Sequence, residues 1–265
     1  MRPDALGAAL GTRTIAQAGG TCVSQRVIPK AVTPKPRGLF ETAMSVGQHL
    51  PGTLVHICNR KLKRRLCRRV DDTFSAVIAD TGPGDLCVDL GANVGVISAR
   101  FHATGADVIS FEPDPVAFAE LSARFARDDR ITLVNKAASV EDTQMLLRRS
   151  TPADSAKAVA QSVESSIIRA GGRMDNENAV MVDVVDIVAF LTDLDRDIRI
   201  LKMDIEGAEW DTLQRLMQAP VLQRIDCIFV ETHERFEPAR LIPIFNDLQA
   251  RAVQMDRPYI NLYWV

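Results

Sequence analysis

The chain has 265 residues, of which 46% are apolar, and this is enough for one α/β domain with an appended segment. No window approaches the roughly 18 uninterrupted apolar residues of a membrane-spanning helix, so we expect no such helix. The five cysteines are scattered and form no Cys-x-x-Cys pair, which argues against a zinc site and a disulfide framework. A reducing, cytoplasmic location is therefore the simplest expectation.

The net charge of −2 is spread unevenly. The first 70 residues hold 13 lysines and arginines but only 2 acids, whereas the rest of the chain holds 19 basic and 32 acidic residues. The basic residues are densest over 60–69, and such a run is usually a solvated helix face. The alternative is contact with an anionic membrane surface or a carrier. Aromatic residues for base stacking are scarce there, so we expect no nucleic-acid partner.

Taken in order, residues 1–38 are rich in Gly, Ala, Thr and Pro, and we predict that they are disordered. Residues 39–80 favour a helical extension that is broken near Pro51 and Gly52. Residues 81–265 form the main domain, in which apolar strands and helices alternate. The core strands are expected at 86–90, 106–111, 131–135, 199–204 and 226–231. Further strands are expected at 142–148, 179–184, 252–255 and 258–264, and helices at 94–104 and 237–250.

Alternating strands and helices predict a Rossmann-like, mostly parallel sheet with helices on both faces. The polar stretch 150–178 between two of the additional strands is expected to be an insertion or a lid. Ligands in such sheets bind beyond the carboxyl ends of the strands. The residues that follow each strand are therefore the ones to examine for function.

The most informative segment follows the first core strand, where Asp89 precedes the turn Gly91-Ala-Asn-Val-Gly95. A tight glycine turn between a strand and a helix lets a ligand approach the backbone. The fingerprint Gly-x-Gly-x-x-Gly of NAD-binding proteins is absent, because position 93 is Asn and position 96 is Val. An acid at the strand end suits a ligand with a cationic end. S-adenosylmethionine carries an ammonium and a sulfonium and has no pyrophosphate.

Two other strand ends could complete a cofactor site. Glu112 lies about 20 residues beyond the glycine turn, where a carboxylate can accept hydrogen bonds from ribose hydroxyls. The alternative is an acid that favours the start of the helix beside Pro113. The small polar segment 135–139 suits an adenine edge and equally suits a simple turn.

The last two core strands end in acids and a histidine. Asp204 ends one strand, and Glu206 and Glu209 flank Gly207, which allows a sharp turn into a helix. Glu231 and His233 follow the other strand and point the same way in an extended chain. The pKa of histidine lies near neutrality, so His233 is the first candidate to remove a proton from a hydroxyl, and Asp204 is the second.

Together these motifs resemble the FkbM-like branch of class I S-adenosylmethionine-dependent methyltransferases. The resemblance covers about residues 82–235 and rests on Gly84-Asp85, Val88–Gly95, Phe111–Pro113, Lys202–Glu209 and Val230–His233. It implies a seven-stranded sheet with an antiparallel last strand and methyl transfer to a hydroxyl of a sugar, glycan or small secondary metabolite. The cofactor-binding residues would be Asp89, Gly91, Ala92, Asn93, Gly95, Glu112, Pro113, Ala137 and Asp204. The catalytic residues would be His233, Asp204, Glu206 and Glu231.

The expected mechanism is direct displacement, in which the protein supplies position and a proton acceptor. We expect no bound metal, although Asp204, Glu206 and Glu231 are ligands of the kind that Mg²⁺ accepts. Two other functions stay open. One is a nucleotide-dependent oxidoreductase on the same fold, and the other is a non-catalytic protein that acts through its basic segment. The sequence does not indicate an oligomeric state.

Overall fold

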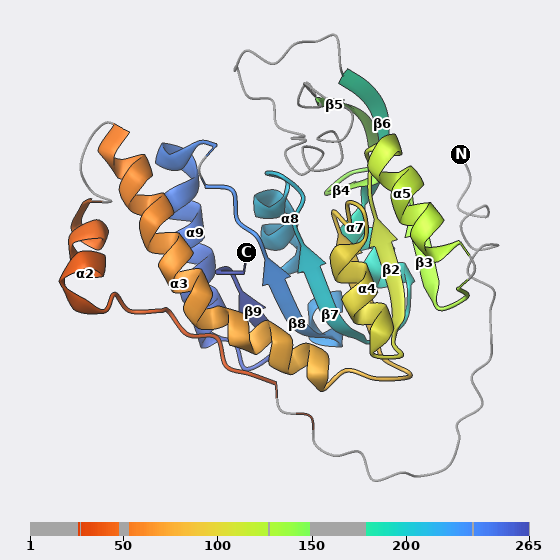
Figure 1. The fold of residues 1–265 in the computed structure, drawn as a ribbon, viewed down its shortest axis with the longest axis horizontal. Coiled ribbons are helices and arrows are strands. Elements are labelled where there is room, and N and C mark those ends of the chain that lie inside the picture. Colours follow the sequence, from red (N-terminus) through yellow and green to blue (C-terminus); the bar gives the residue numbers. More distant parts are fainter. Residues whose placement is uncertain are drawn as a thin grey trace.

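The computed structural model describes residues 26, 28–47, 53–126, 128–148, 179–234 and 236–264. Its centre is a six-stranded sheet in the order β3-β2-β1-β7-β8-β9 (Figure 1). The strands are β1 (Leu86–Leu90), β2 (Asp107–Phe111), β3 (Ile131–Val134), β7 (Ile198–Met203), β8 (Ile225–Val230) and β9 (Tyr259–Asn261). All the neighbouring strands pair in parallel. The predicted α/β, Rossmann-like fold is confirmed.

Two details of the predicted sheet are wrong within the described residues. The sheet has six strands, and β9 is parallel to β8 rather than antiparallel. The cause is α9 (Pro238–Gln254), which returns the chain from the carboxyl end of β8 to the edge where the parallel strands begin. A strand that starts there runs parallel to β8, as strands do after helical crossovers. The strand expected at 252–255 is mostly the end of this helix, because Leu241, Leu248 and Ala252 continue a buried face at helical spacing.

Helices cover both faces of the sheet, as predicted (Figure 1). Asp114 caps one of them, since its Oδ1 accepts hydrogen bonds from the N–H groups of Val116 (2.7 Å) and Ala117 (3.4 Å), and Pro115 occupies the first turn. The covering elements are α4 (Val96–Ala103), α5 (Pro115–Phe125), α7 (Ile187–Asp193), α8 (Glu209–Leu216), α9 and the short 3₁₀ helix η3 (Pro220–Arg224).

A smaller, three-stranded sheet in the order β4-β6-β5 stands beside the main one. It consists of β4 (Ala137–Ser139), β5 (Thr143–Arg148) and β6 (Ala179–Asp186), and β5 and β6 pair antiparallel. The additional strands expected at 142–148 and 179–184 are therefore present. The insertion predicted at 150–178 lies outside the described residues.

Among the described residues of the N-terminal part are the helices α2 (Gly38–Gly47) and α3 (Thr53–Ala79), and the break predicted near Pro51 and Gly52 lies outside the described residues. The long helix α3 packs against the main domain (Figure 1), and Phe74 is its central contact. The ring of Phe74 lies 4.8 Å from that of Phe229 and 5.3 Å from that of Trp264, measured between centroids.

The segment before α2 also contacts the domain. Of the residues predicted to be disordered, 1–25 and 27 lie outside the described residues, but Ala31 is buried in the main core. Arg26 forms an ion pair with Asp85 at 2.5 Å. No helix in the described ranges is both long and apolar enough to cross a membrane.

Candidate active site

The carboxyl ends of the central strands bring the predicted functional segments to one edge of the sheet. Strands β1 and β7 pair with Leu90 beside Met203, and the N–H of Asp204 donates to the carbonyl of Leu90 at 3.0 Å. On the other side of β7, the N–H of Glu231 donates to the carbonyl of Met203 at 2.9 Å. The glycine turn, the acidic turn after β7 and the segment after β8 are thus fixed side by side.

The glycines of the first turn are required by close packing. Gly91 has a φ of +77°, and a Cβ atom there would lie 1.8 Å from the backbone carbonyl oxygen of Asp204. Gly95 has a φ of +82°, and its Cβ would lie 2.6 Å from Cδ1 of Leu121 on α5. Both positions favour glycine because of the left-handed backbone and because of the neighbouring atoms. The glycine turn therefore packs directly against the backbone of Asp204.

The backbone N–H groups of the glycine turn all donate within the protein. The N–H groups of Gly91 and Ala92 donate to the carbonyl of Phe111, and that of Gly95 donates to the carbonyl of Ala92. The N–H groups of Asn93 and Val94 donate to side-chain oxygens of Glu112 and Asn93. Phosphate-binding turns direct such groups at the ligand. This turn is therefore poorly suited to a pyrophosphate.

Asp89 lies behind the turn, fully buried, and not at its surface. Its Oδ2 accepts a hydrogen bond from Ser98 Oγ at 2.6 Å, and its Oδ1 lies 3.1 Å from Nζ of Lys202. Lys202 is also buried and donates to the carbonyl of Gly91 at 2.6 Å. Burial lowers the pKa of Lys202, but the charges of Asp89 and Asp204 outweigh it and hold the pKa above its ordinary value. The buried ion pair of Asp89 and Lys202 thus stabilises the glycine turn from the interior of the domain.

Glu112 connects the glycine turn to the end of β2. Its Oε2 accepts a hydrogen bond from the N–H of Asn93 at 2.7 Å, and its Oε1 accepts one from the N–H of Asp114 at 2.8 Å. Burial raises the pKa of Glu112 to about 7, against the lowering effect of these two hydrogen bonds. The carboxyl group therefore titrates near neutrality while it holds the turn in place.

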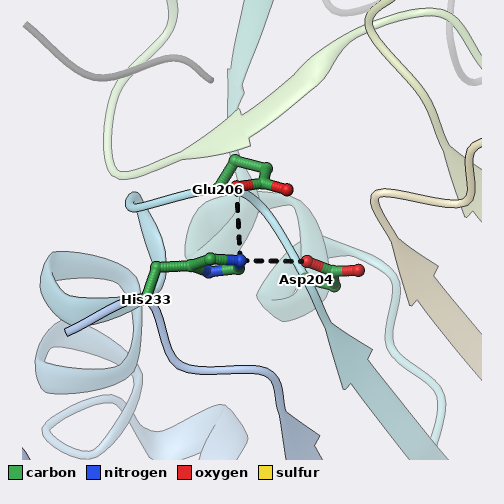
Figure 2. A group of neighbouring side chains, drawn as sticks. All are labelled: Asp204, Glu206 and His233. Carbon is green, nitrogen blue, oxygen red and sulfur yellow. Dashed lines mark ion pairs between the residues drawn. The ribbon is translucent and has the colours of Figure 1, made fainter. Parts of the chain in front are cut away.

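His233 lies among carboxylates at the other side of Asp204 (Figure 2). Glu209 orients it, because Oε1 of this buried acid lies 2.8 Å from Nδ1 and 2.9 Å from the backbone N of His233. The imidazole also stacks on the ring of Phe236, with the centroids 5.3 Å apart. The side chain is only 1% exposed, so its direction is fixed from two sides.

The other ring nitrogen of His233, Nε2, points toward the remaining acids. It lies 3.2 Å from Oε2 of Glu206, 3.8 Å from Oδ1 of Asp204 and 3.9 Å from Oε1 of Glu231. Burial lowers the pKa of His233, but the hydrogen bond that the ring donates to Glu209 and the surrounding negative charges raise it above the ordinary value overall. Burial and the charge of Asp204 raise the pKa of Glu231. The imidazole of His233 and the carboxylate of Glu231 thus both hold protons more tightly than they would in water.

The structure brings together the four predicted catalytic residues and separates one predicted cofactor residue from the others. Ala137 begins β4 and is buried in the small sheet against Leu147 and Val182, so its side chain does not face the site. Ala92 is also buried, and Pro113 contributes its carbonyl, which accepts a hydrogen bond from Asn135 Nδ2 at 3.2 Å. Asp204 lies between the glycine turn and His233, and its assignment to both sets stays a prediction.

Two important residues were not assigned a role from the sequence, namely Lys202 and Glu209. Both belong to the segment Lys202–Glu209, but an exposed ion pair or a helix-starting acid would have given the same pattern. The metal alternative also changes. The group whose ligand atoms lie within 4.8 Å of one another is Asp204, Glu206 and His233, with His233 in the place expected for Glu231.

The fold is Rossmann-like, and the candidate site lies at the carboxyl edge of its sheet. The family model described as the methyltransferase FkbM domain matches residues 89–251. The chain therefore belongs to the FkbM methyltransferase family. No curated protein matches it closely enough to identify a particular relative.

Proposed function

We propose that the protein is an S-adenosylmethionine-dependent O-methyltransferase. The observation that carries the proposal is the position of Nε2 of His233, which faces Asp204 and Glu206 (Figure 2), while the backbone of the same Asp204 packs against Gly91 of the glycine turn. The acceptor is a hydroxyl of a sugar, a glycan or a small secondary metabolite. Membership of a methyltransferase family supports the reaction class, and the chemistry of the cluster supports a hydroxyl acceptor.

The first half of the site fits the proposed cofactor. The internally bonded N–H groups from Gly91 to Gly95 disfavour a pyrophosphate, and the neighbouring acids favour a ligand with cationic groups. Glu112 offers carboxylate oxygens at the distance along the chain where ribose hydroxyls are held. When bound, S-adenosylmethionine supplies a methyl group that its sulfonium activates toward displacement by an oxygen.

The second half of the site supplies the proton acceptor. A hydroxyl must lose its proton when its oxygen takes up the methyl group, and Nε2 of His233 and Oδ1 of Asp204 are the two basic atoms that we assign to this step, 3.8 Å apart. Asp204 reaches the surface, with 28% of its side chain exposed, whereas His233 is buried behind it. A proton that Asp204 takes up from the hydroxyl can therefore pass to the buried imidazole of His233.

Calorimetric titration tests the cofactor half. We expect the protein to bind S-adenosylhomocysteine and not NAD. Replacing Glu112 by Gln should weaken binding by about 10- to 100-fold, since hydrogen bonds to a charged group contribute roughly 1.5–3 kcal/mol. Glu120, exposed on the following helix, provides the matched control, and Glu120→Gln should bind as the wild type does. NAD binding in place of S-adenosylhomocysteine would refute the proposal.

Transfer of a radiolabelled methyl group tests the acceptor half. Incorporation into hydroxyl-bearing sugars, glycans or metabolites is expected. His233→Gln should lower kcat by about 10²–10⁴-fold while S-adenosylhomocysteine still binds, because loss of a proton acceptor affects turnover and not cofactor affinity. Circular dichroism checks that this variant is folded. Labelling only of amines, or unchanged turnover in the variant, would contradict a hydroxyl acceptor activated by His233.

A further inference from the structure

Four ionisable side chains meet beyond the carboxyl ends of β7 and β8, namely Asp204, Glu206, Glu231 and His233. The negative charge of the three carboxylates exceeds the positive charge of the neighbouring lysines. Lys202 forms an ion pair with Asp204 of this group, at 3.8 Å, but it is already paired with Asp89, and its charge and that of Lys63 offset the burial of Glu231 only in part. Lys63 contacts the next acid along the chain, Glu234, at 2.9 Å. Glu206 and Glu231 instead face the same imidazole nitrogen of His233. Such a cluster attracts positive charge.

His233 provides an independent observation. Among the described residues, its Nε2 atom is buried and has no hydrogen-bond partner. The other ring nitrogen, Nδ1, lies 2.8 Å from the buried carboxylate of Glu209. Histidine ligands of metals typically have their second nitrogen bonded to a carboxylate in this way, which fixes the ring and leaves the first nitrogen as a lone-pair donor. The histidine is thus oriented as metal ligands are.

From this arrangement we infer that Asp204, Glu206 and His233 bind a divalent cation of the Mn²⁺ type. One ligand atom of each lies within 4.8 Å of the others. Neighbouring ligands of a small octahedral cation are about 3 Å apart and opposite ones about 4.2 Å. The separations from Nε2, 3.2 Å to Glu206 and 3.8 Å to Asp204, fall in this range. Two carboxylates with one imidazole match a cation that accepts both oxygen and nitrogen.

The cation would act on the acceptor, a role that rests on the proposed function. Three protein ligands leave positions open on an octahedral ion, and Asp204 reaches the surface there. A hydroxyl oxygen bound at an open position has a lowered pKa, as water has on catalytic metals. With the cation bound, His233 would be a ligand in place of a proton acceptor, the metal would lower the pKa of the hydroxyl, and the released proton would pass to the carboxylate of Glu231. Glu231, 3.9 Å from Nε2, flanks the site and adds negative charge.

The binding test uses the full-length protein, stripped with EDTA and titrated with Mn²⁺. Loss of the free-ion signal in electron paramagnetic resonance measures the affinity, and spin-echo modulation by ¹⁴N reports coordination by His233. We expect one site per chain with nitrogen modulation. Glu206→Gln should weaken binding by about tenfold or more, as ligand-sphere changes do. Glu237→Gln, a change of an exposed acid on the neighbouring segment, should leave binding unchanged.

The outcomes separate this inference from the proposed function. Mn²⁺ binding with nitrogen modulation but no methyl transfer to any hydroxyl would support the cation site and contradict the proposed function. Methyl transfer by EDTA-treated protein that binds no Mn²⁺ at millimolar concentration would support the proposed function and contradict the cation site. Binding that is equal in the wild type and in Glu206→Gln, or that lacks the nitrogen signature, would overturn the assignment of these ligands.

Discussion

The ion pair beneath the glycine turn allows a quantitative prediction. Replacing Lys202 by Met removes the cation that lies 3.1 Å from Asp89, and both side chains are at least 97% buried. At that distance the attraction between unit charges is about 5 kcal/mol for an effective dielectric constant of 20. Removing one partner of a buried pair typically costs about 3–5 kcal/mol. We therefore expect Lys202→Met to lower the free energy of unfolding by about 3–5 kcal/mol.

Urea denaturation measures this change, with the fluorescence of the buried Trp210 and Trp264 as the probe. The double variant Asp89→Asn, Lys202→Met should recover at least about 2 kcal/mol, because no uncompensated charge remains and Asn still accepts from Ser98.

The matched control is Arg196→Met, which breaks an ion pair of 2.9 Å with Asp107 where both side chains are more than one third exposed. This control should cost less than about 1 kcal/mol. A loss below about 1 kcal/mol in Lys202→Met, or a double variant as unstable as the sum of the two single ones, would refute the reasoning.

Three further predictions concern the same edge of the sheet. Gly91→Ala should lower the free energy of unfolding by about 3 kcal/mol or more, because the new Cβ meets the Asp204 carbonyl. The control is Gly84→Ala, where φ is +91° and a Cβ would have nothing within 4 Å, so that only backbone strain of about 1–2 kcal/mol is expected. Lys63→Met should lower kcat/KM, since Nζ of Lys63 bonds the backbone and side chain of the residue before His233, and the exposed Lys61→Met should have no effect. A normal kcat/KM in Lys63→Met would show that this bond does not position the imidazole.

The third prediction in this group concerns pH, and it follows from the pKa of about 7 for Glu112. If only the carboxylate accepts the ribose hydroxyls, affinity for S-adenosylhomocysteine is full above pH 7 and falls as pH decreases through it, by about tenfold at pH 6. Calorimetry from pH 6 to pH 8 checks this, with Glu112→Gln expected to be pH-independent. A flat wild-type profile would contradict the assignment.

The sequence was sufficient to predict where the strands lie and which acids collect at their ends. Strand and helix alternation has a strong pattern, and parallel strands must place Asp204 and Glu231 at one edge. The direction of β9 was not predictable in this way, because the resemblance implied an antiparallel strand and the helix before it extends farther than its turn residues indicate.

Burial of charge was the second thing that the sequence could not reveal. Asp89 was predicted to face the ligand, but its partner Lys202 lies 113 residues away and is brought to it only by the pairing of β1 with β7. Glu209 was similarly indistinguishable from a helix-starting acid until the segment after β8 placed His233 beside it. Contacts between distant segments decided the role of each residue.

The packing of α3 has a consequence for the order in which the protein can be made. Phe74 contacts Trp264, and Lys63 bonds Thr232, so residues from the first third of the chain have partners near its end. At about 5–20 residues per second, synthesis of the intervening stretch takes roughly 10–40 s. During that time the apolar face of α3 has none of these partners. The packing of α3 on the main domain is therefore completed only after the segments around Thr232 and Trp264 have been synthesised, which is the slow, non-local kind of contact formation.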